Sequence, residues 1–138
     1  MGKLIRIVLV QALLLTSVAV SAPLLGGGDS ILDANIICSN PSQNAEFYIN
    51  TAAGKVWYKP LNGAGSVEVQ SPLFSGVDPS EKFVGEIMGE MLYAGLPCYT
   101  TVILKNNKGK PELQAQIYSK KNQASMVKLN LSCNVKAN

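Results

Sequence analysis

Histidine is absent from this chain of 138 residues, and arginine occurs once, as Arg6. Without histidine the chain cannot form a Ser-His-Asp triad, a Cys-His dyad, a histidine-bound zinc site or a histidine general base. Without a second arginine it largely lacks the planar fork that binds phosphate in a bidentate way. These absences predict that the protein is not an enzyme and that it carries no metal or cofactor.

Cysteine is also scarce, and the three residues are Cys38, Cys98 and Cys133. An odd number permits one disulfide and leaves one thiol over. One bridge in a chain with 47% hydrophobic residues predicts a domain held together by its core rather than by a disulfide framework. The length predicts a single domain.

Residues 1–22 have the pattern of a secretory signal peptide. Lys3 and Arg6 form a positive start, residues 7–15 are apolar, and Val20-Ser21-Ala22 is a suitable cleavage site. The apolar run is shorter than the roughly 20 residues that span a bilayer. We therefore expect a secreted protein with no membrane segment in its mature form, a single domain over 23–138 in which 23–33 is a flexible leader.

Hydrophobic periodicity predicts two helices. Residues 43–59 are expected to be helical because Phe47, Thr51 and Ala52 would share one face, with Val56 one turn further on. A second, amphipathic helix is expected over 80–93, because apolar residues recur four apart after an Asp-Pro-Ser-Glu helix start at 78–81.

Alternation of polar and apolar residues predicts a strand over 67–74 and a three-stranded antiparallel meander in the last third of the chain. The meander strands are expected at 99–105, 112–119 and 126–133, with a tight turn at 106–109. The alternation places Cys133 on the core side. Together with the two helices, these strands predict an α+β fold.

Lysine is distributed unevenly along the chain. Residues 105–138 carry seven lysines and one acidic residue, a net charge of +6, whereas residues 23–104 carry −5. One interpretation is that these lysines only solvate polar hairpin turns, as charged residues do in many proteins. The other is an electrostatic surface that contacts an acidic partner or, weakly and with a steep dependence on salt, RNA. The lysines expected at such a surface are Lys105, Lys108, Lys110, Lys120 and Lys121.

Three segments carry a family resemblance: Ile36–Cys38, Val69–Gly76 with its Pro-Leu-Phe-Ser-Gly sequence, and Tyr99–Cys133. In these segments the chain resembles the small fungal guanyl-specific ribonucleases and, more closely, the ribonuclease-like secreted effectors of powdery mildew fungi, the RALPH group. The resemblance implies an N-terminal helix packed on a twisted antiparallel sheet, and a disulfide between Cys38 and Cys133 that leaves Cys98 free. On the residues alone, a bridge between Cys38 and Cys98 stays open.

The resemblance also implies that catalysis has been lost. Gln70 stands where active members carry a glutamate base, Thr101 where they carry an arginine, and Tyr118 or Ser119 where they carry a histidine acid. A glutamine side chain cannot take up a proton at neutral pH. The implied function is that of a secreted effector, a virulence or avirulence protein that binds a host protein or RNA. Such a protein is recognised by a plant immune receptor, and it acts outside host cells or after entering them.

Two other functions stay open on the residues. One is a secreted ribonuclease or other hydrolase that uses Glu68, Tyr118 and lysines in an unconventional way. The other is an extracellular structural or ligand-binding module. In addition, Asn130-Leu131-Ser132 is an N-glycosylation sequon, with Asn130 on the outward side of the last predicted strand.

Overall fold

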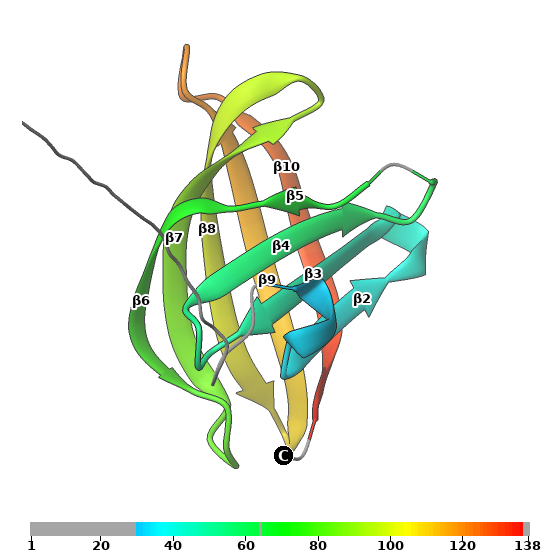
Figure 1. Ribbon diagram of the computed structural model, residues 1–138, viewed down its shortest axis with the longest axis vertical. Helices are drawn as coiled ribbons and strands as arrows, with labels where there is room; N and C mark the ends of the chain where they lie inside the picture. Colours follow the sequence, from blue (N-terminus) through cyan, green and yellow to red (C-terminus); the bar gives the residue numbers. More distant parts are fainter. Residues whose placement is uncertain (1–29, 64, 137–138) are drawn as a thin grey trace, which may run out of the picture.

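A computed structural model of the protein describes residues 30–63 and 65–136 (Figure 1). These residues form one antiparallel sheet of nine strands. The strands are β2 (Ile36–Asn40), β3 (Ala45–Asn50), β4 (Lys55–Pro60), β5 (Val67–Glu68), β6 (Gln70–Asp78), β7 (Val84–Tyr93), β8 (Leu96–Asn107), β9 (Lys110–Ser119) and β10 (Ser125–Val135). Two short 3-10 turns, η2 (Ile31–Asp33) and η3 (Pro41–Gln43), flank β2.

The predicted signal peptide, 1–22, lies outside the described residues. Most of the predicted leader, 23–33, does so too, and its end forms η2. Within 30–63 and 65–136, no helix is long and apolar enough to cross a membrane.

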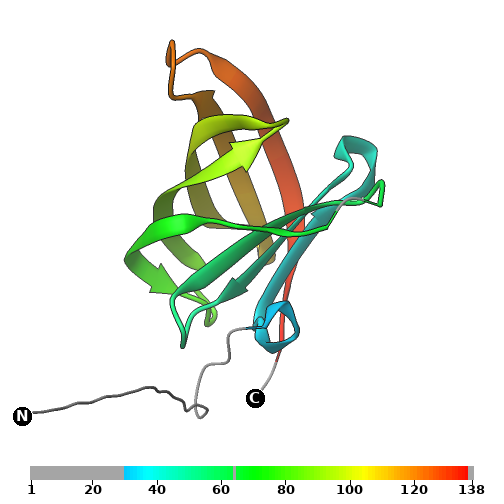
Figure 2. The same ribbon diagram turned by 45° about the horizontal axis from the view of Figure 1, so that its top comes forward.

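The sheet folds over on itself into a nearly closed barrel. Its strand order is β5-β4-β3-β2-β10-β9-β8-β7-β6. Strands β2 to β5 therefore form one wall and β6 to β10 the opposite one (Figures 1 and 2). The chain crosses between the walls where β5 runs into β6: the buried Val69 donates its N–H to the Val56 carbonyl of β4 at 2.8 Å, and Gln70 pairs with Glu90 of β7.

The core fills the space between the two walls. Because successive strand residues point to opposite faces, every second side chain enters it. In β9, for example, Leu113, Ala115 and Ile117 are buried while Gln114 is exposed. The largest side chains that are completely enclosed come from both walls: Phe47, Phe83, Ile36, Ile49, Ile87, Leu104, Leu113 and Ile117.

The predicted α+β fold is wrong, because the part of the chain that the structure describes contains no α-helix. Residues 43–59 form the hairpin β3–β4 instead of a helix. Phe47 and Ile49 are buried at a spacing of two, and aromatic and β-branched residues favour strands. The turn is made by Gly54, at φ +66°, and by the Asn50 side chain, which accepts a hydrogen bond from the Ala53 N–H at 3.0 Å.

The second predicted helix, 80–93, is also wrong, since Val84–Tyr93 is strand β7. Ile87 and Met91 are buried, as the prediction required, but a spacing of four residues fits a strand as well as a helix. The expected capping residue Asp78 accepts a hydrogen bond from the Ser80 N–H at 2.9 Å and so closes a turn rather than opening a helix.

The predicted meander is confirmed. Strand β9 pairs antiparallel with both β8 and β10. The turn at 106–109 is closed by the Asn106 side chain, which accepts a hydrogen bond from the Gly109 N–H. Leu129, Leu131 and Cys133 face the core, as the alternation predicted.

The structure contains one disulfide, between Cys38 and Cys133. The two residues face each other directly across β2 and β10, and both side chains are buried. This is the pairing that the family resemblance implied. Cys98 is a free thiol buried on the inner face of β8. The bridge ties β2 to β10, the first and the last strand in the part of the chain that the structure describes.

Tyr48, on the outer side of β3, is expected to make the stability of the fold depend on pH in the alkaline range. Burial, a 2.8 Å hydrogen bond from its hydroxyl to Glu46, and the charge of Glu46 raise the pKa of Tyr48 to about 12. A folded-state pKa above the usual value of 10 stabilises the fold fully below pH 10, and this contribution is lost as the pH rises through 12. In melting curves between about pH 9 and 12, Tyr48→Phe should therefore lose melting temperature less steeply than the wild type. Parallel pH profiles for the two proteins would contradict this expectation.

Candidate binding surface

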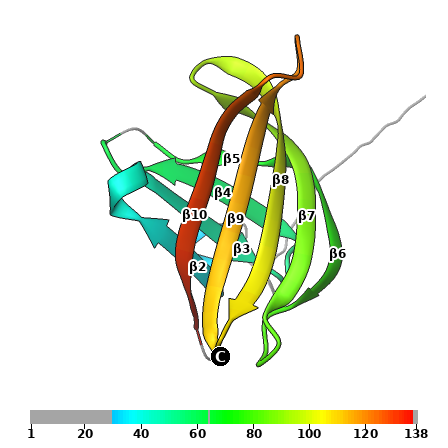
Figure 3. The same ribbon diagram turned by 180° about the vertical axis from the view of Figure 1, so that it is seen from behind.

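Large apolar side chains gather on the outer side of β6, β7 and β8. These three strands lie side by side (Figure 3). Leu73 of β6 is opposite Met88 of β7, and these side chains are 61% and 55% exposed. Leu92, which is 58% exposed, lies further along β7 on the same side. Tyr99 and Ile103 continue the surface on β8, opposite Glu90 and Glu86. We call Leu73, Met88, Leu92, Tyr99 and Ile103 the apolar face.

The apolar face exists because β7 carries apolar residues on both sides, the outward ones alternating with Glu86 and Glu90. Ile87 and Met91 point into the core, whereas Met88 and Leu92 point outward. A strand that covers a core on one side needs apolar residues on that side only. Exposed apolar residues that are contiguous, rather than scattered singly, are typical of interaction sites.

An ion pair lies within the apolar face, because Glu90 stands between Met88 and Leu92 on β7 and opposite Tyr99 on β8. Lys120, just beyond β9, binds Glu90 of β7, and its ammonium lies 5.4 Å from the centre of the Tyr99 ring. The hydrogen bond to Glu90 raises the pKa of Lys120. This pair also adjoins a depression of about 180 Å³, lined among others by Met91 and by Cys98, whose thiol is buried.

A groove of about 190 Å³ adjoins the apolar face on the outer side of β8, β9 and β10. Its lining is rich in side chains that both donate and accept hydrogen bonds, and the Gln114 amide donates to the Asn130 side-chain oxygen at 3.0 Å. The outward-facing residues of the lining are Thr101, Ile103, Gln114, Gln116, Lys128 and Asn130.

The five lysines predicted to form a contact surface do not come together. Lys105, Lys108 and Lys110 surround the β8–β9 turn, whereas Lys120 and Lys121 follow the far end of β9. A strand rises about 3.3 Å per residue, so the length of β9 separates the two groups by roughly 30 Å. Lys120 is moreover bound to Glu90. The structure therefore places these lysines in two small groups, one near each end of β9, rather than on one basic surface.

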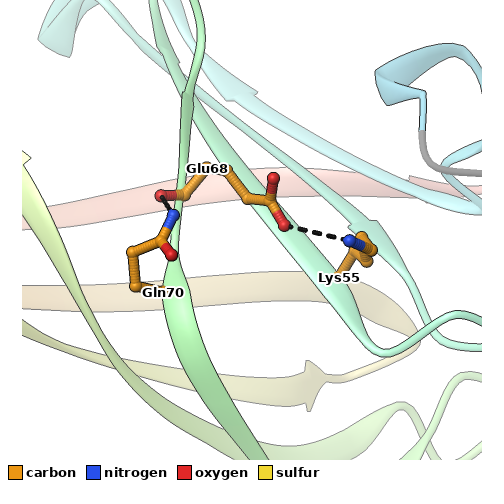
Figure 4. A network of polar contacts seen from close by, with 3 residues as sticks. All are labelled: Lys55, Glu68 and Gln70. Atoms are coloured by element: carbon orange, nitrogen blue, oxygen red, sulfur yellow. Dashed lines mark hydrogen bonds and ion pairs between the residues drawn. The ribbon is translucent and has the colours of Figure 1, made fainter. Parts of the chain in front are cut away.

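The residues proposed for unconventional hydrolysis are also apart. Glu68 of β5 forms an ion pair with Lys55 at 3.3 Å, and its backbone carbonyl accepts from the Gln70 amide at 3.3 Å (Figure 4). Two residues after Glu68 the chain enters β6 at Gln70. Tyr118 lies on β9, three strands away from β6, which is roughly 14 Å at the usual strand spacing. Among the described residues, no cluster of three or more metal-ligating side chains is found.

Sequence reasoning did not find the apolar face. A helix over 80–93 would place Met88 and Leu92 beside Ile87 and Met91 on its buried side. The sequence did contain a signal for it. If these residues form a strand, Ile87 and Met91 lie on one side and Met88 and Leu92 on the other, so one of the two pairs must be exposed.

Comparison with known protein families, with curated proteins and with solved structures finds no match for this chain. The resemblance to ribonuclease-like effectors thus stays a prediction, and the helix that it implied is absent from the described residues.

Proposed function

We propose that the protein is a secreted, non-catalytic binding protein that recognises another protein through the apolar face. The observation that carries this proposal is the set of five exposed apolar side chains on three neighbouring strands. Aromatic residues and methionine are enriched at the centres of protein interfaces, where charged residues are depleted. The apolar face contains Met88 and Tyr99, and its charged neighbour Glu90, which stands between Met88 and Leu92 on β7, is neutralised by the ion pair with Lys120.

The charge distribution favours a protein over RNA as the partner. RNA binding depends on cationic groups that follow the phosphate backbone. The five lysines predicted as a contact surface lie at two ends of the long strands, and one of them, Lys120, is bound to a carboxylate. None of the five side chains of the apolar face between them is cationic.

The dimensions of the surface suit a protein partner. Three strands at about 4.8 Å and nine residues at about 3.3 Å give the outer side of β6–β8 roughly 430 Å². The largest exposed apolar patch on a monomeric protein is roughly 300–600 Å² and is often an interaction site. The free edge of β6 is a poorer docking site, because Pro72 and two register shifts interrupt its ladder with β7 and hinder the addition of another strand.

The expected biological setting is an effector of a plant-pathogenic fungus that binds a host protein and is recognised by an immune receptor. That setting comes from the family resemblance alone and stays a prediction. Binding through the apolar face does not depend on it.

The proposal is tested with the double substitution Leu73→Ser and Met88→Ser. Both side chains are more than half exposed, so the fold should tolerate the change. Truncating two central contacts of an interface should weaken binding at least tenfold, which corresponds to about 1.4 kcal/mol. Partners are captured from plant extract with the immobilised protein, before and after nuclease treatment, and the affinity of each is then measured with purified components.

Leu32→Ser is the matched control, because Leu32 is 82% exposed on η2, away from the apolar face. Its partners and affinities should equal those of the wild type. Partners that survive the double substitution unchanged would contradict the proposal. Partners lost on nuclease treatment would show that RNA, not protein, is recognised.

A further inference from the structure

We propose that Asn130 is an N-glycosylation site and that its oligosaccharide lies over the groove between β8 and β10. This inference concerns a modification rather than the binding partner, and it shares with the proposed function the assumption of secretion and one residue, Ile103, which belongs to both the groove and the apolar face. Asn130-Leu131-Ser132 is the one usable acceptor sequence in the chain, since Asn40-Pro41-Ser42 has proline at the excluded middle position.

The acceptor residue faces outward in the folded protein. Leu129 and Leu131, its neighbours in β10, are buried, whereas Asn130 and Ser132 are exposed. A sugar attached to an inward side chain could not be accommodated in a close-packed core. A sugar attached to Asn130 instead has the open outer side of the sheet available to it.

The hydrogen bonds around Asn130 leave the acceptor nitrogen available. The side-chain oxygen accepts from the Gln114 amide at 3.0 Å. The backbone N–H donates to the Gln43 side-chain oxygen at 2.8 Å, and the backbone carbonyl accepts from the Asn40 amide at 2.7 Å. None of these bonds uses Nδ2, the atom that bears an N-linked sugar, so all three can persist in the glycosylated protein.

The surroundings offer polar contacts to the first sugar. The groove of about 190 Å³ is smaller than the roughly 300–1,000 Å³ of pockets that enclose a whole ligand, so it suits a single ring. Thr101, Gln114 and Gln116 present hydroxyl and amide groups that complement sugar hydroxyls.

The glycan would also lie beside an edge of the sheet. Strand β10 pairs with β2 only from Ser132 onward. Before that point, side chains of Asn40 and Gln43 supply hydrogen bonds to the edge of β10. An edge without a partner strand invites pairing with another chain, and a bulky sugar beside it hinders such pairing.

The modification is a group transfer from a lipid-pyrophosphate-linked oligosaccharide. The Asn130 Nδ2 attacks C1 of the first sugar, so that an N–C bond forms and the C1–O bond to the pyrophosphate breaks. The lipid pyrophosphate leaves with the bonding electrons, and Nδ2 releases one proton to the transferase. The donor and the transferase are supplied by the secretory compartment of a eukaryotic cell.

The test is expression of residues 23–138 in eukaryotic cells behind a leader native to those cells. This design separates the acceptor site from the predicted signal peptide, and hence from the assumption of secretion. The secreted protein is compared by mass spectrometry before and after treatment with a peptide-N-glycosidase. We expect the mass of one core oligosaccharide, removed by the enzyme with conversion of residue 130 to aspartate.

Three variants complete the test. Asn130→Gln and Ser132→Ala should abolish the added mass, whereas Ser132→Thr, a conservative change on the same exposed side, should retain it. Wild-type protein that is secreted and folded with its unmodified mass would overturn the proposal. So would an added oligosaccharide that persists in Asn130→Gln.

Discussion

Replacing Cys38 and Cys133 together with alanine is expected to lower the free energy of unfolding by about 4 kcal/mol. The bridge joins residues 95 apart in sequence, and a cross-link over about 100 residues removes roughly that much chain entropy from the unfolded state. It also fixes β10 against β2, the contact that joins the N-terminal wall of the barrel to the C-terminal meander. The loss is measured by urea denaturation of the oxidised wild type and the double variant.

Cys98→Ala is the matched control for this experiment. Cys98 is buried and free, so this substitution removes a buried sulfur without opening a bridge. Its effect should be about 1 kcal/mol, the usual scale for a small loss of core volume. If the double variant and Cys98→Ala unfold at the same urea concentration, the bridge does not stabilise the fold in this way.

The second large effect is expected at Gly85 of β7, where Val77 of the neighbouring strand β6 approaches the backbone closely. A Cβ atom at this position would lie 2.5 Å from the Val77 Cα, and the backbone has a φ of +141°. The contact is with main chain at the irregularity between Ser75 and Asp78, so no side-chain rotation relieves it. We expect Gly85→Ala to destabilise the protein by about 3 kcal/mol or more, from overpacking together with backbone strain.

Gly95→Ala separates these two causes. Gly95, in the β7–β8 turn, also has a positive φ, +78°, but a Cβ added there would meet no atom within 4 Å beyond its chain neighbours. Its substitution should therefore cost only about 1 kcal/mol, the backbone part of the effect. Both variants are compared with the wild type by thermal and urea unfolding. Equal losses in the two variants would show that the close approach of Val77 does not matter.

The errors and successes of sequence reasoning have physical causes. The meander was predictable because its signals are local: alternation along each strand and a turn at 106–109 closed by Asn106. The helix over 80–93 was predicted wrongly because Phe83, Ile87 and Met91 recur every four residues, which both a helix and a strand place on one side. Gly85 and Gly89 lower helix propensity, but glycine is depleted in strands as well, so they did not identify the strand.

The candidate site depended even more on the tertiary structure. The lysines of the last third lie close together in sequence, yet antiparallel strands carry successive turns to opposite ends of the sheet. The apolar face is assembled from β6, β7 and β8, and its residues span positions 73 to 103. Its outline follows from the pairing register, which no local pattern specifies.

By itself, the sequence determined which chemistry is missing and which residues of the meander share a side, since composition and alternation are properties of the chain alone. Only the tertiary structure decided which apolar side of β7 faces the core, that the sheet curls into a barrel, and that Cys38 meets Cys133 rather than Cys98. Those outcomes depend on contacts between residues far apart in sequence, and such contacts are selected by the packing of the whole domain.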